Sequence, residues 1–370
     1  MKEKGSIIPN LNGLRFIGAI SVLIFHFFSL SREVFIDFQD QTWYKILYKI
    51  ASKGHYGVNL FFVLSGFLLV GILLDEVKKR GAIQPFHFLL RRILRIWPLY
   101  FLIVLFGFLL FPLLPLGIET KHSLLNYSLF LSNLDEIWYG VNDPLNFLTV
   151  TWSVSIEEQF YFALILLLFL LPFFRRGKYF PIYFLIIIAS SIVFRFLYLN
   201  DPRILYYHTL SNISGLAVGG ILAWGIRNLP LEQFFQQLKR VWIVVMYLCG
   251  LTLIFASSFI FKGAMTCLQQ IAIDLFFAFV ILEQVYSKHS FWKADRLPYF
   301  FNLGKYTYGI YMFHCIFIYY LNHVFESYPP TILNFILYGF TLVLSTFVSS
   351  YISMRFFEKP FLSLRHQFKG

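Results

Sequence analysis

Long apolar runs recur along the whole of this 370-residue chain, and charged residues bound each of them. A membrane-spanning helix needs about 20 consecutive, mostly apolar residues, because it rises about 1.5 Å per residue across a hydrocarbon core about 30 Å thick. Ten runs meet this requirement, which predicts an all-α, polytopic transmembrane helical bundle forming a single domain over residues 1–370. The predicted spans are residues 11–30, 57–74, 93–115, 157–174, 179–199, 209–226, 241–261, 264–285, 306–325 and 331–354.

The composition excludes a water-soluble protein of this size. Apolar residues make up 58% of the chain and charged residues only 14%, whereas soluble domains contain about 45–50% and about 25%. The net charge of +12 does not indicate nucleic-acid binding, because Lys and Arg lie between the apolar runs and form no basic face. Three cysteines, Cys249, Cys267 and Cys315, lie within apolar runs, and we expect them to be buried apolar side chains.

The distribution of Lys and Arg predicts how the spans are oriented, since these residues favour cytoplasmic loops. With the N-terminus inside, 22 of the 31 Lys and Arg fall in cytoplasmic segments and 7 in outer loops, while Arg15 and Arg195 remain within spans. The bias holds in every pair of loops except the first. We therefore expect both termini in the cytoplasm, and a first helix that is retained because no small-residue cleavage site follows it.

Two ionisable residues share one face of the first predicted span. Arg15 and His26 are 11 residues apart, which is about 1100° around a helix and within about 20° of three full turns. An ionisable group inside a membrane is costly, so such a pair is a candidate functional site. The alternative is that Arg15 reaches the interface and His26 is a hydrogen-bonded interior histidine.

The second and third predicted spans contain further candidates. Ser65 and Gly66 are small residues that let helices approach closely, and we interpret them as a packing contact. Arg92 and Arg95, at positions i and i+3 of a helix, point to one side and could surround phosphate oxygens. They could equally be charges that bind lipid head groups at the membrane surface.

Polar residues precede the fourth predicted span in the segment TWSVSIEEQFY, which would face the outside. Ser155 could cap the helix, and Glu157 and Glu158 would interact favourably with its dipole. Capping explains one acid better than two, and a hydroxyl-bearing substrate could meet this segment. Further ionisable residues within or beside apolar runs are Asp274, Glu283, Arg195, His314 and Glu358.

Six sequence blocks, taken in order, resemble the acyltransferase 3 family of bacterial integral-membrane O-acyltransferases. They extend from Leu11 to Phe361 and so cover nearly the whole chain, which is similar to the short members that have no appended soluble domain. The blocks are an NGLRFI segment with a histidine eleven residues after its arginine, GVNLFFVLSGF, RRILRIWP, TWSVSIEEQFY, YGIYMFH and FEKPF.

The resemblance implies transfer of an acyl group, acetyl or succinyl, from cytoplasmic acyl-CoA to a hydroxyl group of a cell-surface glycan or its lipid-linked precursor. It places the protein in the bacterial plasma membrane, among membrane lipids. Acyl-CoA would be the donor substrate, and we expect neither a permanently bound cofactor nor a metal.

The resemblance also implies roles for individual residues. His26 corresponds to the catalytic base of the family, and Arg15 is required alongside it. Arg92 and Arg95 match an RxxR motif near the CoA phosphates. A family WSLSxE block matches here with Val154 in place of leucine, and Thr307 replaces a common serine of the ninth span. We expect Glu157 to be catalytic, and the predicted substrate-binding residues are Trp152, Ser153, Glu158 and His314.

Our mechanistic hypothesis is that neutral His26 removes a proton from the acceptor hydroxyl, which attacks the thioester directly or through an acyl-enzyme. Glu157 would position the acceptor or orient His26. The alternative function is a transporter or flippase of a lipid-linked glycan, although the sequence contains no inverted repeat or matching pair of broken helices. A structural or sensory membrane protein would leave the shared face of Arg15 and His26 unexplained.

Overall fold

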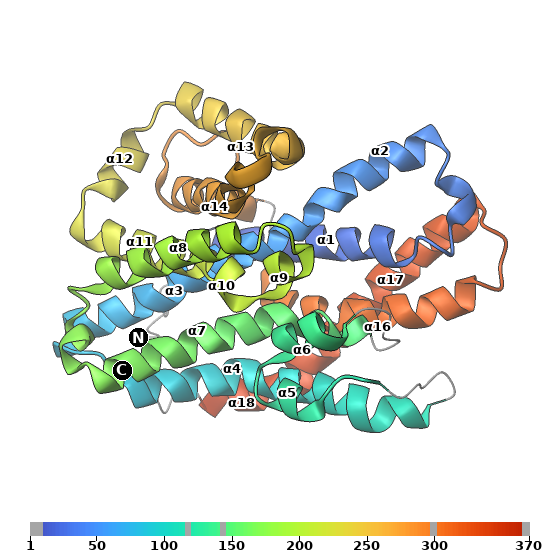
Figure 1. The fold of residues 1–370 in the computed structure, drawn as a ribbon, viewed down its shortest axis with the longest axis horizontal. Coiled ribbons are helices and arrows are strands. Elements are labelled where there is room, and N and C mark those ends of the chain that lie inside the picture. The colour runs from blue at the N-terminus through green and yellow to red at the C-terminus, as the bar shows by residue number, and fades with distance from the viewer. Residues whose placement is uncertain (1–9, 115–119, 141–145, 297–301, 365–370) are drawn as a thin grey trace.

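The computed structural model describes residues 10–114, 120–140, 146–296 and 302–364. Within these ranges all regular secondary structure is helical, which confirms the all-α prediction. The helices are α1 (Leu11–Leu30), α2 (Thr42–Ala51), α3 (Gly57–Arg80), α4 (Pro85–Leu105), α5 (Leu124–Ser128), α6 (Ser132–Tyr139), α7 (Thr151–Leu170), α8 (Phe180–Leu197), α9 (Pro202–Tyr207), α10 (Thr209–Asn212), α11 (Ser214–Asn228), α12 (Leu231–Gln237), α13 (Arg240–Ile260), α14 (Gln269–Tyr286), α16 (Thr307–Phe325), α17 (Ile332–Ile352) and α18 (Lys359–Leu364) (Figure 1).

Eight helical segments of the described chain are long and apolar enough to cross a membrane, so the protein is a multi-pass membrane protein. The predicted spans 209–226 and 306–325 are also helical but fall outside this set. The first is divided at Ile213, which leaves α11 with 15 residues. The second, α16, has 19 residues, among which four tyrosines, two histidines and an asparagine lower its hydropathy.

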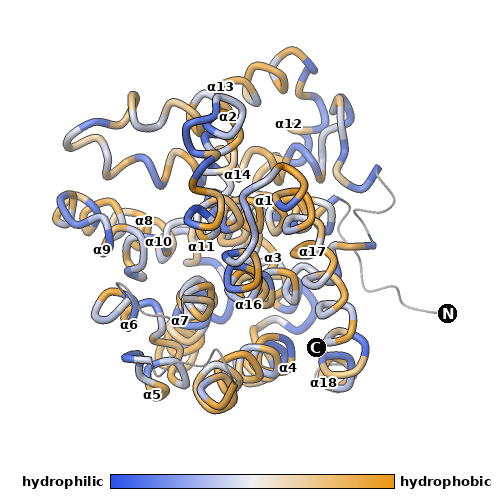
Figure 2. The backbone as a smooth tube through the Cα atoms, turned by 90° about the vertical axis from the view of Figure 1, so that its right-hand side faces the viewer, coloured by the Kyte–Doolittle hydropathy of each residue, from blue (hydrophilic) through white to orange (hydrophobic). Residues whose placement is uncertain are grey.

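The outer helices of the bundle present apolar side chains on their exposed faces. Figure 2 shows hydrophobic colouring along most helix bodies and hydrophilic colouring mainly in the connections. Only 17% of the most apolar stretch of α13 is buried, and only 22% of that of α8. These faces are suited to contact lipid, because hydrocarbon replaces water around them. Cys249 on α13 is exposed, which corrects the expectation that all three cysteines are buried.

Two helices begin earlier than the apolar runs predicted. Helix α4 begins at Pro85 instead of residue 93, and α7 begins at Thr151 instead of residue 157. Polar residues that face the protein interior do not interrupt a helix, so an apolar run underestimates its length. The predicted capping role of Ser155 is therefore wrong, because its hydroxyl lies inside α7 and 2.7 Å from that of Ser132.

Close packing joins α3 and α11 at the centre of the bundle. A Cβ atom on Gly66 would lie 2.0 Å from the carbonyl oxygen of Leu216, and one on Gly219 would lie 2.1 Å from that of Val63. Neither position has room for a side chain, and small residues allow this approach of membrane helices. The packing interpretation of Gly66 is confirmed.

The helices that carry the candidate site residues meet in the interior of the bundle. Helix α1 contacts α3 and α16, α4 contacts α7 and α16, and α3 contacts α7. Figure 1 shows these segments side by side although they come from distant parts of the sequence. The polar residues on their facing surfaces are thereby brought together away from lipid.

Candidate active site

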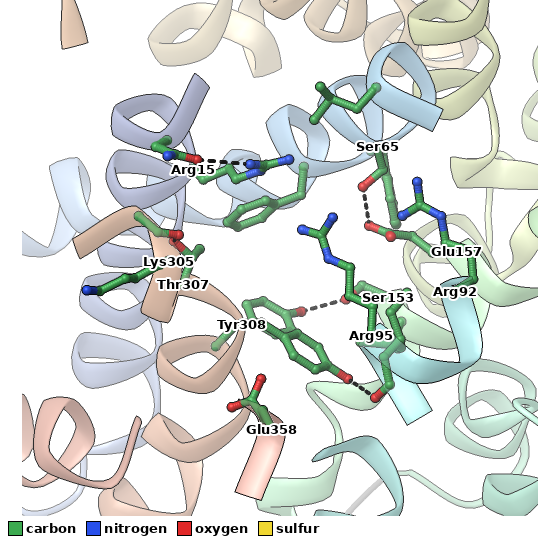
Figure 3. Close-up of a pocket in the computed structure, with 18 of the residues that line it drawn as sticks. Arg15, Ser65, Arg92, Arg95, Ser153, Glu157, Lys305, Thr307, Tyr308 and Glu358 are labelled. Atoms are coloured by element: carbon green, nitrogen blue, oxygen red, sulfur yellow. Dashed lines mark hydrogen bonds between the residues drawn. The ribbon is translucent and has the colours of Figure 1, made fainter. Parts of the chain in front are cut away.

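A cavity of about 430 Å³ lies among α1, α3, α4, α7 and α16. Its polar side chains include several predicted site residues, and Figure 3 shows them converging on the same space. We call it the basic cavity. Its volume suits one elongated small molecule. Asn12 near the first described residue and Leu362 near the last both line it. Its charged lining residues are Arg15, Arg92, Arg95, Lys305, Glu157 and Glu358.

Positive charge exceeds negative charge in the basic cavity. Within the described part of the chain, Arg15, Arg92 and Arg95 form no ion pair with a carboxylate. A guanidinium group inside a membrane protein is costly unless it has a partner. An anionic ligand would supply one, and the planar fork of arginine matches phosphate oxygens.

Two of these arginines lie on one side of α4, as their spacing predicted. The guanidinium of Arg92 lies 5.1 Å from the ring centre of Tyr161 and 5.8 Å from that of Phe88, and the residue is only 9% exposed. Arg95, one turn later, is exposed to the cavity. Both arginines line the basic cavity, where a ligand could meet them.

Arg15 is positioned by the way α1 begins. The carboxylate of Asp295 accepts hydrogen bonds from the backbone N–H groups of Asn10 (2.5 Å) and Gly13 (2.9 Å). It therefore satisfies donors at the start of a helix that have no partner within the helix. Arg15 in turn donates from Nη1 to Oδ1 of Asn12, at 3.1 Å, and lines the cavity.

Glu157 lines the same cavity as the arginines, with both of its carboxylate oxygens held. Oε1 accepts from the hydroxyl of Ser65 at 3.0 Å and Oε2 from that of Tyr161 at 2.8 Å. We expected this segment at the outer face. Because α7 begins six residues earlier than predicted, Glu157 lies about 9 Å from the N-terminal end of the helix instead of at that end.

The neighbours of Glu157 on α7 point in three directions, because successive helical residues differ by about 100°. Ser153 lines the cavity, and its Oγ lies 2.7 Å from the hydroxyl of Tyr311. Trp152 instead packs on Tyr206, with ring centres 5.1 Å apart. Glu158 accepts from the indole N–H of Trp97 at 2.9 Å. Trp152 and Glu158 lie outside the lining of the basic cavity.

His26 and His314 form a contact between α1 and α16. Nδ1 of His26 lies 2.7 Å from Nε2 of His314, and the ring centres are 5.0 Å apart. Nδ1 of His314 lies 3.1 Å from the carbonyl oxygen of Ile310, which can only accept, so this Nδ1 carries a proton. In neutral His314, Nε2 is then the acceptor, and Nδ1–H of His26 donates to it. His26 is left with an unprotonated Nε2.

A second cavity, of about 390 Å³, lies beyond the histidine pair and is called the outer cavity. Thr307, Tyr308 and Tyr311 of α16, with Gly304 and Lys305 just before it, line the basic cavity. Further along the same helix, residues from Cys315 to His323 and Glu326 just after its end line the outer cavity. Along α1 and the segment after it, Asn12 and Arg15 line the first, while Leu30, Glu33 and Val34 line the second. The histidine pair therefore lies between the two cavities.

A metal ion could be held by the same pair together with one thiol. The ligand atoms of His26, His314 and Cys315 all lie within 4.8 Å of one another. Two nitrogens and a sulfur suit a zinc ion. Such an ion would replace the hydrogen bond between the histidines. The sequence pattern did not indicate this cluster, because His26 is 288 residues away from His314 and its neighbour Cys315.

Comparison with known proteins shows the family. A family model described as an acyltransferase domain matches residues 8–355. The chain belongs to the acyltransferase 3 family. It is 26% identical, over 381 residues and 97% of its length, to a protein of Staphylococcus aureus strain COL that carries the provisional name of an O-acetyltransferase. It is 25% identical, over 375 residues and 95% of its length, to the O-acetyltransferase OatA of Staphylococcus aureus strain NCTC 8325 / PS 47.

The match covers only part of these relatives. The chain spans 58% of the length of the first and 57% of the length of OatA. No solved structure matches the chain.

Several residues that line the two cavities were missed from the sequence alone. Asn12, Lys305 and Tyr308 line the basic cavity, and Cys315 lines the outer one. Tyr308 and Tyr311 lie in the YGIYMFH block three residues apart, and that helical spacing from His314 was the available signal. Lys305 and Cys315 carried no such signal, since lysines and apolar-run cysteines are common in any membrane protein.

Proposed function

We propose that this acyltransferase moves an acyl group, acetyl first and succinyl as the second choice, from cytoplasmic acyl-CoA to a hydroxyl group of a cell-surface polysaccharide or its lipid-linked precursor. The observation that carries the proposal is the histidine pair, which lies between two cavities located towards opposite ends of α1 and α16. The names of the O-acetyltransferase relatives support acetyl as the group transferred. A bacterial plasma membrane is the proposed location.

The basic cavity would hold the donor. Its arginines would bind the CoA phosphates at the side that the charge distribution assigns to the cytoplasm, because these anions cannot enter hydrocarbon. The pantetheine arm would follow α16 from Lys305 towards Ser153 and Tyr311. That path brings the thioester near the histidine pair, since Tyr311 and His314 are one turn apart and their ring centres are separated by 5.9 Å.

His26 would act as the general base. Its unprotonated Nε2 removes the proton of the acceptor hydroxyl as the oxygen attacks the thioester carbonyl carbon. The carbon–sulfur bond then breaks, and the CoA thiolate leaves and takes that proton back from His26. His314 accepts the hydrogen bond from Nδ1–H throughout, so it fixes the tautomer that catalysis requires.

Other predicted site residues would act through this arrangement. Glu157 would keep Arg92 and Arg95 apart and oriented towards the donor, because it shares their cavity. The hydroxyl groups of Ser153 and Tyr311 could donate to the oxygen that becomes negative when the thioester is attacked. Trp152 and Glu158 would hold α7 in place, through the ring contact of Trp152 with Tyr206 and the hydrogen bond of Glu158 with Trp97.

The test is mass spectrometry of surface glycans and lipid-linked intermediates from matched cells. The strains express the wild type, His26→Ala, no protein, or His289→Ala as a control that removes an exposed histidine away from both cavities. We expect the glycan mass to increase by one acetyl or succinyl group only in the strains that express the wild type or the control. A change in the amount or sidedness of glycan without a mass change would indicate a transporter instead.

A further inference from the structure

We infer that the outer cavity binds the acceptor sugar and selects an uncharged or amine-bearing sugar over an anionic one. The inference rests on the proposed function, because it names the acceptor of the same reaction. The cavity has a volume of about 390 Å³ and is separated from the histidine pair by Cys315. Cys315 lines it, and the Sγ atom of this cysteine lies 3.3 Å from Nε2 of His314.

The charged groups of the outer cavity are hydrogen-bond acceptors. Glu33 and Glu326 line it from the segment after α1 and from the end of α16. Within the described chain, neither side-chain carboxylate forms a hydrogen bond or an ion pair, and both residues are exposed. An ionised carboxylate only accepts hydrogen bonds. A ligand between these residues must therefore bring donors.

The side chains of His323 and Asn322 do not reverse this balance. Nδ1 of His323 lies 3.0 Å from the carbonyl oxygen of Tyr319 and so carries a proton, which makes Nε2 of the neutral ring an acceptor. Asn322 is already engaged, since its amide donates to Leu30 and its oxygen accepts from the hydroxyl of Tyr338. The cavity consequently favours a polyhydroxyl or ammonium ligand.

One wall of the outer cavity is aromatic. Phe147 and Tyr319 both line it, with ring centres 5.9 Å apart, and the ring of Tyr319 lies 4.7 Å from that of His323. A sugar ring presents hydroxyl groups around its edge and apolar C–H groups on its faces. Binding sites that combine an apolar wall with a few placed polar groups are suited to such a ligand.

Charge then decides between classes of sugar. Two unpaired carboxylates would repel the carboxylate of a uronic acid or a phosphate group, and repulsion of this kind is how binding sites reject wrong partners. They would attract the ammonium group of an amino sugar. The charge of the outer cavity thus favours neutral and amine-bearing acceptors over anionic ones.

The experiment measures equilibrium binding of three radiolabelled tetrasaccharides to the full chain in lipid nanodiscs. The probes are maltotetraose, which is neutral, a glucosamine tetramer, which bears amines, and tetragalacturonate, which is anionic. The proteins are the wild type, the double variant Glu33→Gln/Glu326→Gln, and Asp37→Asn. The last is a matched control that removes an exposed carboxylate of the same outer segment, outside the cavity lining.

We expect the wild type and Asp37→Asn to bind the first two sugars at least about tenfold more tightly than tetragalacturonate. The double variant should bind the glucosamine tetramer at least about tenfold more weakly, because charge-assisted hydrogen bonds are stronger than those between neutral groups. Equal or tighter binding of tetragalacturonate to the wild type, an unchanged affinity of the double variant, or no binding of any probe would overturn the inference.

Transfer from radiolabelled acetyl-CoA in the same preparations separates this inference from the proposed function. If the wild type transfers acetyl groups and the double variant does so equally well, the outer cavity is not the acceptor site. That result would overturn the inference and leave the proposed function standing. Sugar binding as expected without transfer to any acceptor would support the binding site and overturn the proposed function.

Discussion

Nδ1 of His26 lies 2.7 Å from Nε2 of His314, and the other nitrogen of His314 is held by the carbonyl oxygen of Ile310. The contact with Ile310 determines which nitrogen of His314 is protonated. The contact between the two histidines then determines which nitrogen of His26 carries the proton. A fully buried histidine on α16 thus sets the tautomer of a half-buried histidine on α1. Neither histidine is among the residues that line the two cavities. Because His314 is fully buried and contacts Nδ1 of the half-buried His26, we assign it a positioning role and not the substrate-binding role expected from the sequence.

Replacement of His314 tests this positioning role. We expect His314→Leu to lower kcat for acetyl transfer by about 10²-fold, within the 10²–10⁴-fold that a positioned general base contributes. His314→Gln should recover much of the loss, because its side-chain oxygen can accept the hydrogen from Nδ1 of His26. Equal kcat values for the two variants, at equal protein levels in the membrane, would contradict the positioning role.

Removal of the cavity arginines tests donor binding. We expect Arg92→Gln and Arg95→Gln each to raise KM for acetyl-CoA by about tenfold to hundredfold, since a hydrogen bond to a charged group contributes about 1.5–3 kcal/mol. KM for the acceptor should change little. Arg91→Gln is the matched control, because Arg91 lies 3.3 Å from Glu76 and outside the cavity lining. An equal effect of Arg91→Gln would indicate a general effect of charge.

Replacement of Asp274 tests how much a buried hydrogen-bond network contributes to the stability of the bundle. Asp274 is fully buried, and its carboxylate accepts from Asn59 at 2.9 Å and from Ser214 at 2.7 Å. We expect Asp274→Ala to lower the free energy of unfolding by about 2–5 kcal/mol, because two buried donors lose their acceptor, and Asp274→Asn to cost less.

The control for Asp274 is Asp75→Ala, which removes an exposed ion pair with Arg227. An exposed pair contributes about 0–1 kcal/mol. Thermal unfolding in detergent measures all three variants. A loss in Asp274→Ala no larger than that in Asp75→Ala would contradict the structural role of the buried network.

Added zinc tests the cluster of His26, His314 and Cys315. We expect Zn²⁺ to inhibit transfer by binding the two imidazoles and the thiol, and a chelator to reverse the inhibition. The chelator alone should leave the wild type active. The Zn²⁺ concentration that halves the variant's own activity should be at least about tenfold higher for Cys315→Ala than for the wild type. Loss of a residue that only supports a metal ligand already lowers metal affinity by about 10–100-fold, and Cys315 would be a ligand itself. Unchanged sensitivity would mean that zinc inhibits elsewhere.

Much of the fold could be predicted because hydrocarbon imposes simple rules on length and polarity. The apolar runs placed most of the spans, and the helical repeat placed Arg15 and His26 on one side of α1. The same rules misjudged the starts of α4 and α7, where polar side chains face protein instead of lipid. Hydropathy does not distinguish a polar residue in a loop from one that points into a cavity.

The order of residues alone is enough to identify a helical membrane protein with a charged residue and a histidine on its first span, because burial of charge in lipid is too costly to be incidental. What these residues meet depends on how the helices pack. This packing separated Glu157, in the basic cavity, from Glu158, against Trp97. It also brought His26 to His314 across 288 residues of chain. Contacts between helices depend on how their faces pack, and packing is a property of the whole bundle that no local pattern records.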